Sequence, residues 1–360
     1  MKKSKALLVI GIIVIVAASV AVSAWYAQTL MKPPEAITWA EWGGPYEATV
    51  RQIAQQYEQK TGHHVNIVLH AGASSSTFTK IKAAWPNVVV DVYASGAGTA
   101  YQACQGNYAI ALTQQDIPNL AQIPKNLNTY YQGNVCGVAE APASWVLAWR
   151  TDYVKKNLTS FNDLLAPEFK HKVAISDPTQ GTGQFLIAAA YAFGGNETNL
   201  APGWDFAKKL AQSGNIGLVY TSEADLVNAL TTGQAWIGFG GAWNVRAAIQ
   251  QGAPLAFSKV VDSTIVVNND IVTIMNGPRQ AIAKDFVNYL LSPEINQQYA
   301  AGIGYPPANV NSKEAPAVAP WYPTPQQYAQ YGHSPDPSVV SANFDSWVKQ
   351  WQEQIVPLIH

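Results

Sequence analysis

The sequence predicts an α/β protein made of two lobes that are joined by two extended segments. Short apolar runs typical of strands alternate with segments of helical periodicity. This alternation occurs twice, before residue 94 and again between residues 173 and 239. The chain has 360 residues, of which 48% are hydrophobic. A single hydrophobic core rarely extends over more than about 250 to 300 residues, so we expect this longer chain to form two cores.

The first block of alternating elements lies near the N-terminus. An apolar run at residues 36–40 predicts a strand, which ends in a turn at Trp42, Gly43 and Gly44. Residues 46–60 follow as an amphipathic helix. The remaining elements of this block are a strand at 65–69, a small-residue loop at 71–76, a helix at 77–84 and a strand at 88–93.

The second block repeats this order of elements. It begins with a strand at 173–176, a loop at 177–183 and a helix at 184–193. The alternation continues with segments at 204–212, 218–220, 222–230 and 235–239. Extended runs at 145–149 and 265–274 connect the two blocks. The segment at 315–337 is rich in Pro and Tyr and is predicted to be irregular, and residues 344–355 are predicted to form a last helix.

The N-terminal residues 1–30 predict export across a membrane. Lys2, Lys3 and Lys5 precede an uncharged run at residues 6–27, which is typical of a signal peptide or a membrane anchor. Val22, Ser23 and Ala24 offer a cleavage site, and cleaved and uncleaved forms are equally expected. In either case, the rest of the chain lies outside the cytoplasm, secreted or membrane-anchored, at the cell surface or in a periplasm.

The two cysteines, Cys104 and Cys136, predict one disulfide in an extracytoplasmic protein, with two buried free thiols as the alternative. Asn157 and Asn196 begin N-glycosylation sequons, which matter only in a host that glycosylates.

Composition and motifs exclude several function classes. The net charge is −1 and only 12% of residues are charged, so no basic stripe is available to bind nucleic acid. The chain contains no HExxH, GxSxG, SxxK or GxxxxGK[ST] motif, and its six histidines show no metal-ligand spacing. We therefore expect no catalytic residues, no metal and no cofactor, and the chain is expected to be a monomer. An extracytoplasmic hydrolase is the rival class, and Asp177, Glu223 and Asp270 are the acids that could meet in its cleft.

Five loops follow the predicted strands and are candidates for a ligand site. They are rich in Gly, Ser, Thr, Trp and Asn and cover residues 41–44, 72–76, 95–98, 177–183 and 240–244. In open α/β sheets, ligands bind beyond the carboxyl ends of the strands. Ordinary turn chemistry would favour the same residue types in any one loop. Five such loops together indicate a site.

Several segments resemble type II periplasmic solute-binding proteins of ABC importers. The opening turn WGGPY, from Trp42 to Tyr46, and the later YEQKTG at residues 57–62 resemble the start of that family. Further resemblances follow in the same order along residues 37–312, in the segments DVYAS (91–95), WRTDYVK (149–155), NDLL (162–165), KVAISDP (172–178), DFVNYLLSPE (285–294) and GYPPAN (304–309).

The resemblance implies two α/β lobes joined by two hinge strands, with a small solute trapped between them and delivered to a membrane permease. Lobe 1 would comprise residues 31–145 and 263–314, and lobe 2 residues 146–262. The C-terminal extension, residues 315–360, would pack on the lobes. The ligand-binding residues expected from the loops and the resemblance are Trp42, Gly43, Ser74, Ser75, Ser95, Trp145, Thr179, Gly181, Thr182, Trp243, Asn244, Asp270 and Tyr305.

The nearest groups within this family are the spermidine/putrescine-binding and the ferric-iron-binding proteins. Polyamine binders carry a W-x-D pattern on a hinge strand, where this chain has Asn268, Asn269 and Asp270. Ferric binders carry a Tyr pair after a strand, and the corresponding residues 238–243 hold no tyrosine. A third alternative is an anion held at the helix start near Gly181. The resemblance favours a polyamine-like or other small organic solute.

Overall fold

The computed structural model describes residues 36–70 and 74–359. The predicted signal peptide or anchor (residues 1–30), with the helix expected there, and residues 71–73 of the predicted loop lie outside these ranges. Within the described ranges, no helix combines the length and the apolar character required to cross a membrane.

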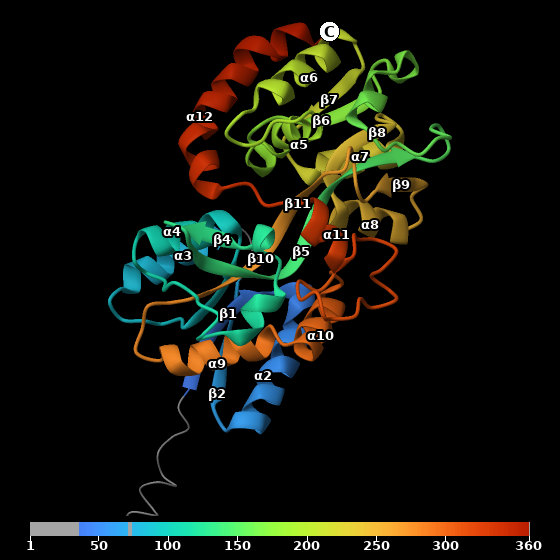
Figure 1. Cartoon of the computed structure of the whole chain (residues 1–360). Coiled ribbons are helices and arrows are strands. Elements are labelled where there is room, and N and C mark those ends of the chain that lie inside the picture. The colour runs from blue at the N-terminus through green and yellow to red at the C-terminus, as the bar shows by residue number, and fades with distance from the viewer. Residues whose placement is uncertain (1–35, 71–73, 360) are drawn as a thin grey trace, which may run out of the picture.

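The described residues form two lobes along one continuous sheet (Figure 1). Eleven strands of the described chain take part, and the main path is β2-β1-β3-β10-β5-β8-β6-β7. Pairing is parallel within β2-β1-β3 and within β8-β6-β7, and antiparallel around β10 and β5. The predicted α/β class with two lobes is confirmed.

The main hydrophobic core of the lower lobe in Figure 1 surrounds Trp39, Tyr57 and Phe286, and a smaller cluster surrounds Phe78 and Tyr93. The Trp39 and Tyr57 rings each meet the Phe286 ring at a centroid distance of 5.0 Å. Its elements are β1 (Ala36–Trp42), α2 (Glu47–Thr61), β2 (His64–His70), α3 (Ser74–Ala84), β3 (Val92–Ser95), α4 (Ala97–Gln105), β4 (Thr129–Tyr131), α9 (Gln280–Leu290) and α10 (Pro293–Ile303).

The upper lobe has a core of its own, in which Phe161, Phe185, Phe206 and Phe239 pack against one another. Its elements are β6 (Val173–Ser176), α5 (Gln184–Ala192), α6 (Ala201–Gln212), β7 (Ile216–Tyr220), α7 (Glu223–Thr232), β8 (Ile237–Gly241), α8 (Ala242–Gln250) and β9 (Leu255–Ser258).

Two long strands, β5 (Asn134–Arg150) and β10 (Ile265–Ile274), run between the lobes (Figure 1). Up to Ser144, β5 pairs with β10, and from Trp145 onward it pairs with β8. The predicted connection at 145–149 is therefore only the upper part of a 17-residue strand. The change of partner between Ser144 and Trp145 marks where one lobe ends and the other begins.

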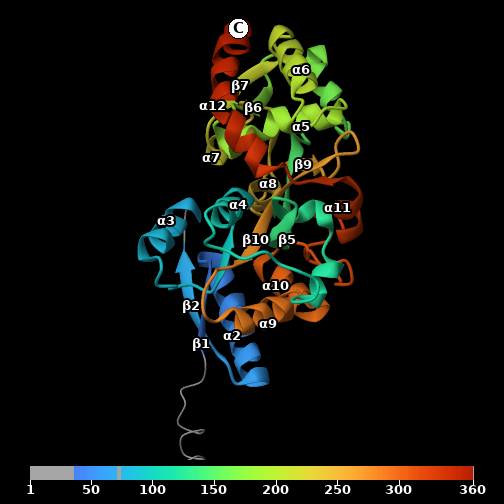
Figure 2. The ribbon, with the colours of Figure 1, turned by 60° about the vertical axis from the view of Figure 1, so that its left-hand side comes forward.

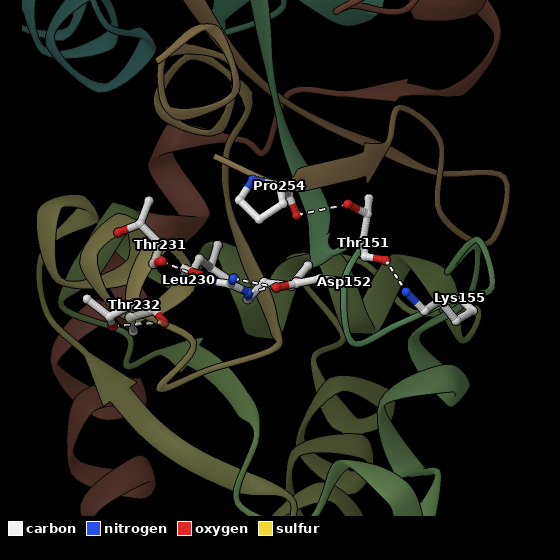
Figure 3. Close-up of polar contacts among 9 residues, drawn as sticks. Thr151, Asp152, Lys155, Leu230, Thr231, Thr232 and Pro254 are labelled. Atoms are coloured by element: carbon white, nitrogen blue, oxygen red, sulfur yellow. Dashed lines mark hydrogen bonds and ion pairs between the residues drawn. The ribbon is translucent and has the colours of Figure 1, made fainter. Parts of the chain in front are cut away.

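A polar network fixes the upper end of β5. The Arg150 guanidinium donates to the Leu230 and Thr231 carbonyl oxygens at 2.9 and 2.7 Å and forms an ion pair with Asp152. Figure 3 shows the neighbouring contacts, in which Thr151 donates to the Pro254 carbonyl oxygen at 3.1 Å. Because Arg150 satisfies carbonyls at the end of α7, this network holds the strand within the upper lobe.

The C-terminal segment differs from the prediction of irregular structure for residues 315–337. It contains α11 (Pro325–Tyr331) and β11 (Gly332–His333), and α12 (Pro337–Gln354) begins seven residues before the predicted helix start at 344. The missed signals are helix caps: Thr324 accepts from the Gln327 N–H, and Asp336 accepts from the Ser338 N–H ahead of Pro337.

The C-terminal segment packs against both lobes. Val318 and Tyr322 join the hydrophobic cluster around α7 and α8, whereas Tyr328 lies in the lower core. Trp347 and Trp351 of α12 are buried in the upper core. Figures 1 and 2 show α12 running from the level of α4 to the far end of the upper lobe.

Two boundaries in the lower lobe differ from the prediction. β3 begins at Val92 rather than at residue 88. The first backbone hydrogen bond from this segment to β1 is the one that the Asp91 N–H donates to the Thr38 carbonyl oxygen, so the residues before it do not pair with the sheet. Val89 stays half-exposed. Ser74 and Ser75, predicted in a loop, form the first turn of α3.

Cys104 of α4 and Cys136 of β5 are joined by a disulfide with a Cα–Cα distance of 6.1 Å. The bond closes a sequence separation of 32 residues and ties the start of the crossing strand to the lower lobe. The sequon residues Asn157 and Asn196 are both exposed.

Replacing both cysteines, Cys104→Ser with Cys136→Ser, is expected to lower the free energy of unfolding by about 3 to 4 kcal/mol, because a loop of this length constrains the unfolded chain. Urea unfolding of the variant and of the wild type, each with and without reductant, measures the effect. A reductant-insensitive wild type with the stability of the variant would contradict it.

Candidate functional site

Three carboxyl groups lie together where β1, β5 and β10 meet. Glu41 of β1 and Glu140 of β5 are fully buried, and Asp270 of β10 is partly exposed. Burial, and then the charge of the neighbouring carboxyls, raises the pKa of Glu41 well above its usual value and the pKa of Glu140 to about 8. Burial also raises the pKa of Asp270 to about 7. The three groups hold protons that exposed carboxyls would release.

Hydrogen bonds connect the carboxyl groups of this cluster to their neighbours. The Tyr46 hydroxyl donates to Asp270 Oδ2 at 2.8 Å, the Tyr299 hydroxyl donates to Glu140 Oε1 at 3.3 Å, and the Trp42 N–H donates to Glu41 Oε1 at 2.7 Å. The buried Glu41 and Glu140 carboxyls also share a hydrogen bond with each other, which requires one of the two to be protonated. Because an unpaired buried carboxylate is costly, the cluster favours an added proton or a cation.

Aromatic rings surround the carboxyl cluster. The Tyr46 ring lies 6.5 Å from Tyr299 and 6.3 Å from Tyr305, and Tyr305 lies 5.6 Å from Tyr322, all measured between centroids. The Trp42 ring packs on His70 at 4.5 Å. Aromatic faces beside carboxylates can bind an organic cation through both charge and ring electrons.

The upper lobe contributes a second group of residues, organised by Glu223. This carboxylate accepts from the Gly241 N–H at 3.0 Å and from the Asn244 and Gln180 amides at 3.3 Å each. It thereby ties the loop after β6 to the start of α8. The Trp243 ring meets Trp145 edge-on at 5.8 Å, and both lie at the point where β5 enters the upper lobe.

A direct contact links the lobes beside the aromatic rings. Arg246 of α8 donates to the carbonyl oxygen of Gly304, the residue that ends α10, and its guanidinium carbon lies 5.6 Å from the Tyr322 ring centroid. Gly304 has φ +79°, and a Cβ there would come within 2.8 Å of the guanidinium. The φ value favours glycine at this position, and an added side chain would displace the Arg246 guanidinium from its contact.

Between the lobes lies a cavity of about 450 Å³. Its walls come from the start of α4, the loop before α5, residues 267–269 of β10 and residues of the C-terminal segment from Ser334 to Asp345. A cavity of this size suits a small organic molecule.

The structure places the predicted ligand residues in three groups. Trp42, Gly43, Asp270 and Tyr305 lie at or next to the carboxyl cluster, Ser74 and Thr182 line the cavity, and Trp145, Trp243 and Asn244 lie on the upper lobe. The others lie apart from the cavity lining: Ser75 is exposed on α3, Ser95 is fully buried, Thr179 bonds to Asp177, and Gly181 belongs to a short 3-10 turn, Gln180–Thr182.

The sequence analysis did not name Glu140 or Tyr46 as ligand residues, and it included Glu41 only within the candidate loop at residues 41–44. Glu140 interrupts an otherwise apolar strand, and this break in the pattern is the signal that could have found it. The acids named for a hydrolase do not form one group: Asp177 caps its own turn, Glu223 holds upper-lobe loops, and Asp270 lies with Glu41 and Glu140. Among the described residues, no three His, Cys, Asp or Glu side chains are arranged to hold a metal ion.

Comparison with known proteins identifies relatives of one kind. Residues 52–327 match the family of bacterial extracellular solute-binding proteins. A spermidine/putrescine-binding periplasmic protein of Salmonella typhimurium is 25% identical over 171 residues, which cover 46% of this chain and 47% of the relative. The chain thus spans about half the length of this relative.

Solved structures share the fold over most of the chain. An ABC transporter structure from Clostridium perfringens covers 89% of this chain and 99% of its own, with a TM-score of 0.75 and 19% identity. Ferric iron-binding protein A of Mannheimia haemolytica covers 89% and 98%, with a TM-score of 0.70 and 17% identity. The expected periplasmic-binding-protein fold is confirmed.

The raised pKa values predict how stability depends on pH. Glu140 titrates near 4 in the unfolded chain and at about 8 in the folded one, so its contribution to folding weakens as pH rises between these values. Glu140→Gln is expected to gain stability relative to wild type at pH 8 and to gain little at pH 4. Urea unfolding of both proteins across this range measures the difference. A stability difference that does not change with pH would contradict the prediction.

Proposed function

Because the chain belongs to the family of bacterial extracellular solute-binding proteins, we propose that it is the substrate-binding protein of an ABC importer. It captures a small solute between its lobes outside the cytoplasm and delivers it to a membrane permease. The N-terminal segment secretes the protein or anchors it to the membrane.

The carboxyl cluster is the observation that favours a cationic solute. Three carboxyls gathered at one point favour a nearby positive charge, and Trp42, Tyr46 and Tyr305 supply ring faces beside them. A protonated amine fits both requirements. The similarity to spermidine/putrescine-binding proteins agrees with a polyamine-like or other amine-bearing solute. Ferric iron and small anions are the alternatives for the same cleft.

Capture proceeds by closure of the lobes about the crossing strands, where β5 changes partner between Ser144 and Trp145. Residues 36–144 and 263–314 act as one lobe, residues 145–262 act as the other, and the C-terminal extension packs on both. Ligand stabilises the closed state only by contacting both lobes, through Asp270 on one and Trp243 on the other.

Asp270→Asn is expected to weaken binding of 1,4-diaminobutane or spermidine by about 30-fold or more, since losing one partner of a buried charge pair costs roughly 2 to 5 kcal/mol. The same variant should unfold at a higher temperature without ligand at pH 8, because it removes a negative charge beside two other carboxyls. Calorimetric titration and thermal melting measure the two effects.

Ferric citrate and inorganic phosphate serve as comparison ligands in this titration. Wild-type protein that binds either of them and no amine would refute the cationic organic solute. A variant that keeps the wild-type amine affinity would remove Asp270 from the site.

Trp243→Ala is expected to weaken amine binding about tenfold while leaving the fold intact, because the ring is half-buried at the start of α8 and faces Trp145. Trp236→Ala is the matched control. Trp236 is also half-buried in the upper lobe, and its ring stacks on Tyr153. Trp236 precedes β8, whereas Trp243 follows β8. Equal affinity losses in the two variants would show that Trp243 acts only through packing.

A further inference from the structure

The cavity between the lobes has a lining unlike that of the carboxyl cluster. The lining combines hydroxyl and amide side chains with apolar ones, and the described lining residues include no Lys, Arg or His and a single acid, Asp345 on α12. The polar residues are Ser74, Thr99, Gln102, Thr182, Gln184, Asn268, Asn269, Ser334 and Ser341. Such a lining recognises uncharged hydrogen-bonding groups more readily than a second full charge.

Two amide oxygens of this lining lack donors. Asn269 is 4% exposed, and its Nδ2 donates to the Leu127 carbonyl oxygen at 2.7 Å. Its Oδ1 accepts no hydrogen bond from any residue that the structure describes. The buried Oε1 of Gln184 likewise accepts no hydrogen bond within the described ranges. Because buried amide oxygens are nearly always hydrogen-bonded, these two atoms point to a ligand that brings donors.

The same cavity offers unpaired donors at the start of α4. Gly96 is the N-cap residue of this nine-residue helix and has no side chain to cap it. The Ala97 and Gly98 N–H groups donate to no acceptor in the described ranges, and Gly96, Ala97 and Gly98 all line the cavity. A group that both donates and accepts, such as a hydroxyl, satisfies donors and acceptors together.

The cavity and the carboxyl cluster adjoin each other along β10. Asn268 and Asn269 line the cavity, and Asp270 follows them directly. Ile271, which follows Asp270, pairs with Ser95, and Ser95 is followed by Gly96 at the start of α4. Asn268 and Asp270 lie about 7 Å apart along the strand. One small molecule can therefore reach both regions.

We infer that the ligand is a hydroxylated amine, such as an amino sugar or an aminated polyol. Its ammonium group lies at the carboxyl cluster and its hydroxyls lie in the cavity. This inference rests on the proposed function and names the class of solute. The α12 residues Ser341 and Phe344 form one wall of the cavity, so the C-terminal segment determines specificity alongside the strand-end loops.

Three probes with the same six-carbon chain separate the contributions. They are 1-amino-1-deoxysorbitol, which has an amine and hydroxyls, sorbitol, which has hydroxyls only, and 1,6-diaminohexane, which has amines only. In calorimetric titration of the purified protein, the aminated polyol is expected to bind at least about tenfold more tightly than either of the others.

The outcomes distinguish this inference from the proposed function. If 1,6-diaminohexane binds as tightly as the aminated polyol, the inference is overturned and amine recognition stands. If sorbitol binds as tightly, amine recognition falls together with the inference. Absence of binding by all three probes also overturns it.

A pair of variants on α12 tests the position of the hydroxyls. Ser341→Trp fills the cavity and is expected to reduce affinity for 1-amino-1-deoxysorbitol at least about tenfold, whereas Ser346→Trp, exposed on the same helix outside the cavity lining, is expected to leave it unchanged. Thermal melting confirms that both variants fold. Unchanged affinity in a folded Ser341→Trp protein would overturn the assignment of the cavity.

Discussion

The pairing of β5 with β10 is the interaction on which the two-lobed architecture depends. The two strands bond to each other from Val267 to Val272, and each then continues into other pairings, β10 with β3 and β5 with β8. Every other element packs around one side or the other of this shared ladder. The carboxyl cluster lies on it, because Glu140 and Asp270 belong to the two strands and Glu41 to the nearby β1.

Burying three acids at this point works against the stability of the empty protein. Glu41 and Glu140 are fully buried, and Asp270 accepts a hydrogen bond from the Tyr46 hydroxyl. Packing alone does not account for acids at these positions, because burying them lowers the free energy of unfolding. In the proposed function, a cationic ligand offsets this cost by supplying positive charge, and the same carboxyls then discriminate against solutes that lack it.

The sequence predicts the fold better than the site, for physical reasons. β6 and β10 have the predicted bounds because their apolar runs end at polar or turn residues. Asp270 and Trp243 were named because they fall near positions of family patterns. Glu140 was not named, and Glu41 was named only as part of a loop, because these side chains come together from strands that are distant in sequence. The starts of α11 and α12 were missed because the Pro- and Tyr-rich composition of residues 315–337 was interpreted as irregular structure.

The path of the C-terminal segment limits how the lobes can move. After α10 the chain contacts the upper lobe at Tyr322, returns to the lower core at Tyr328 and ends in the upper core at Trp351. Two lobes connected only by two neighbouring strands can both bend and twist relative to each other. Additional contacts of the C-terminal segment with both lobes restrict these motions. The two lobes of the open protein then have fewer relative orientations available to them. In the proposed closure on a solute, they therefore lose less rotational entropy.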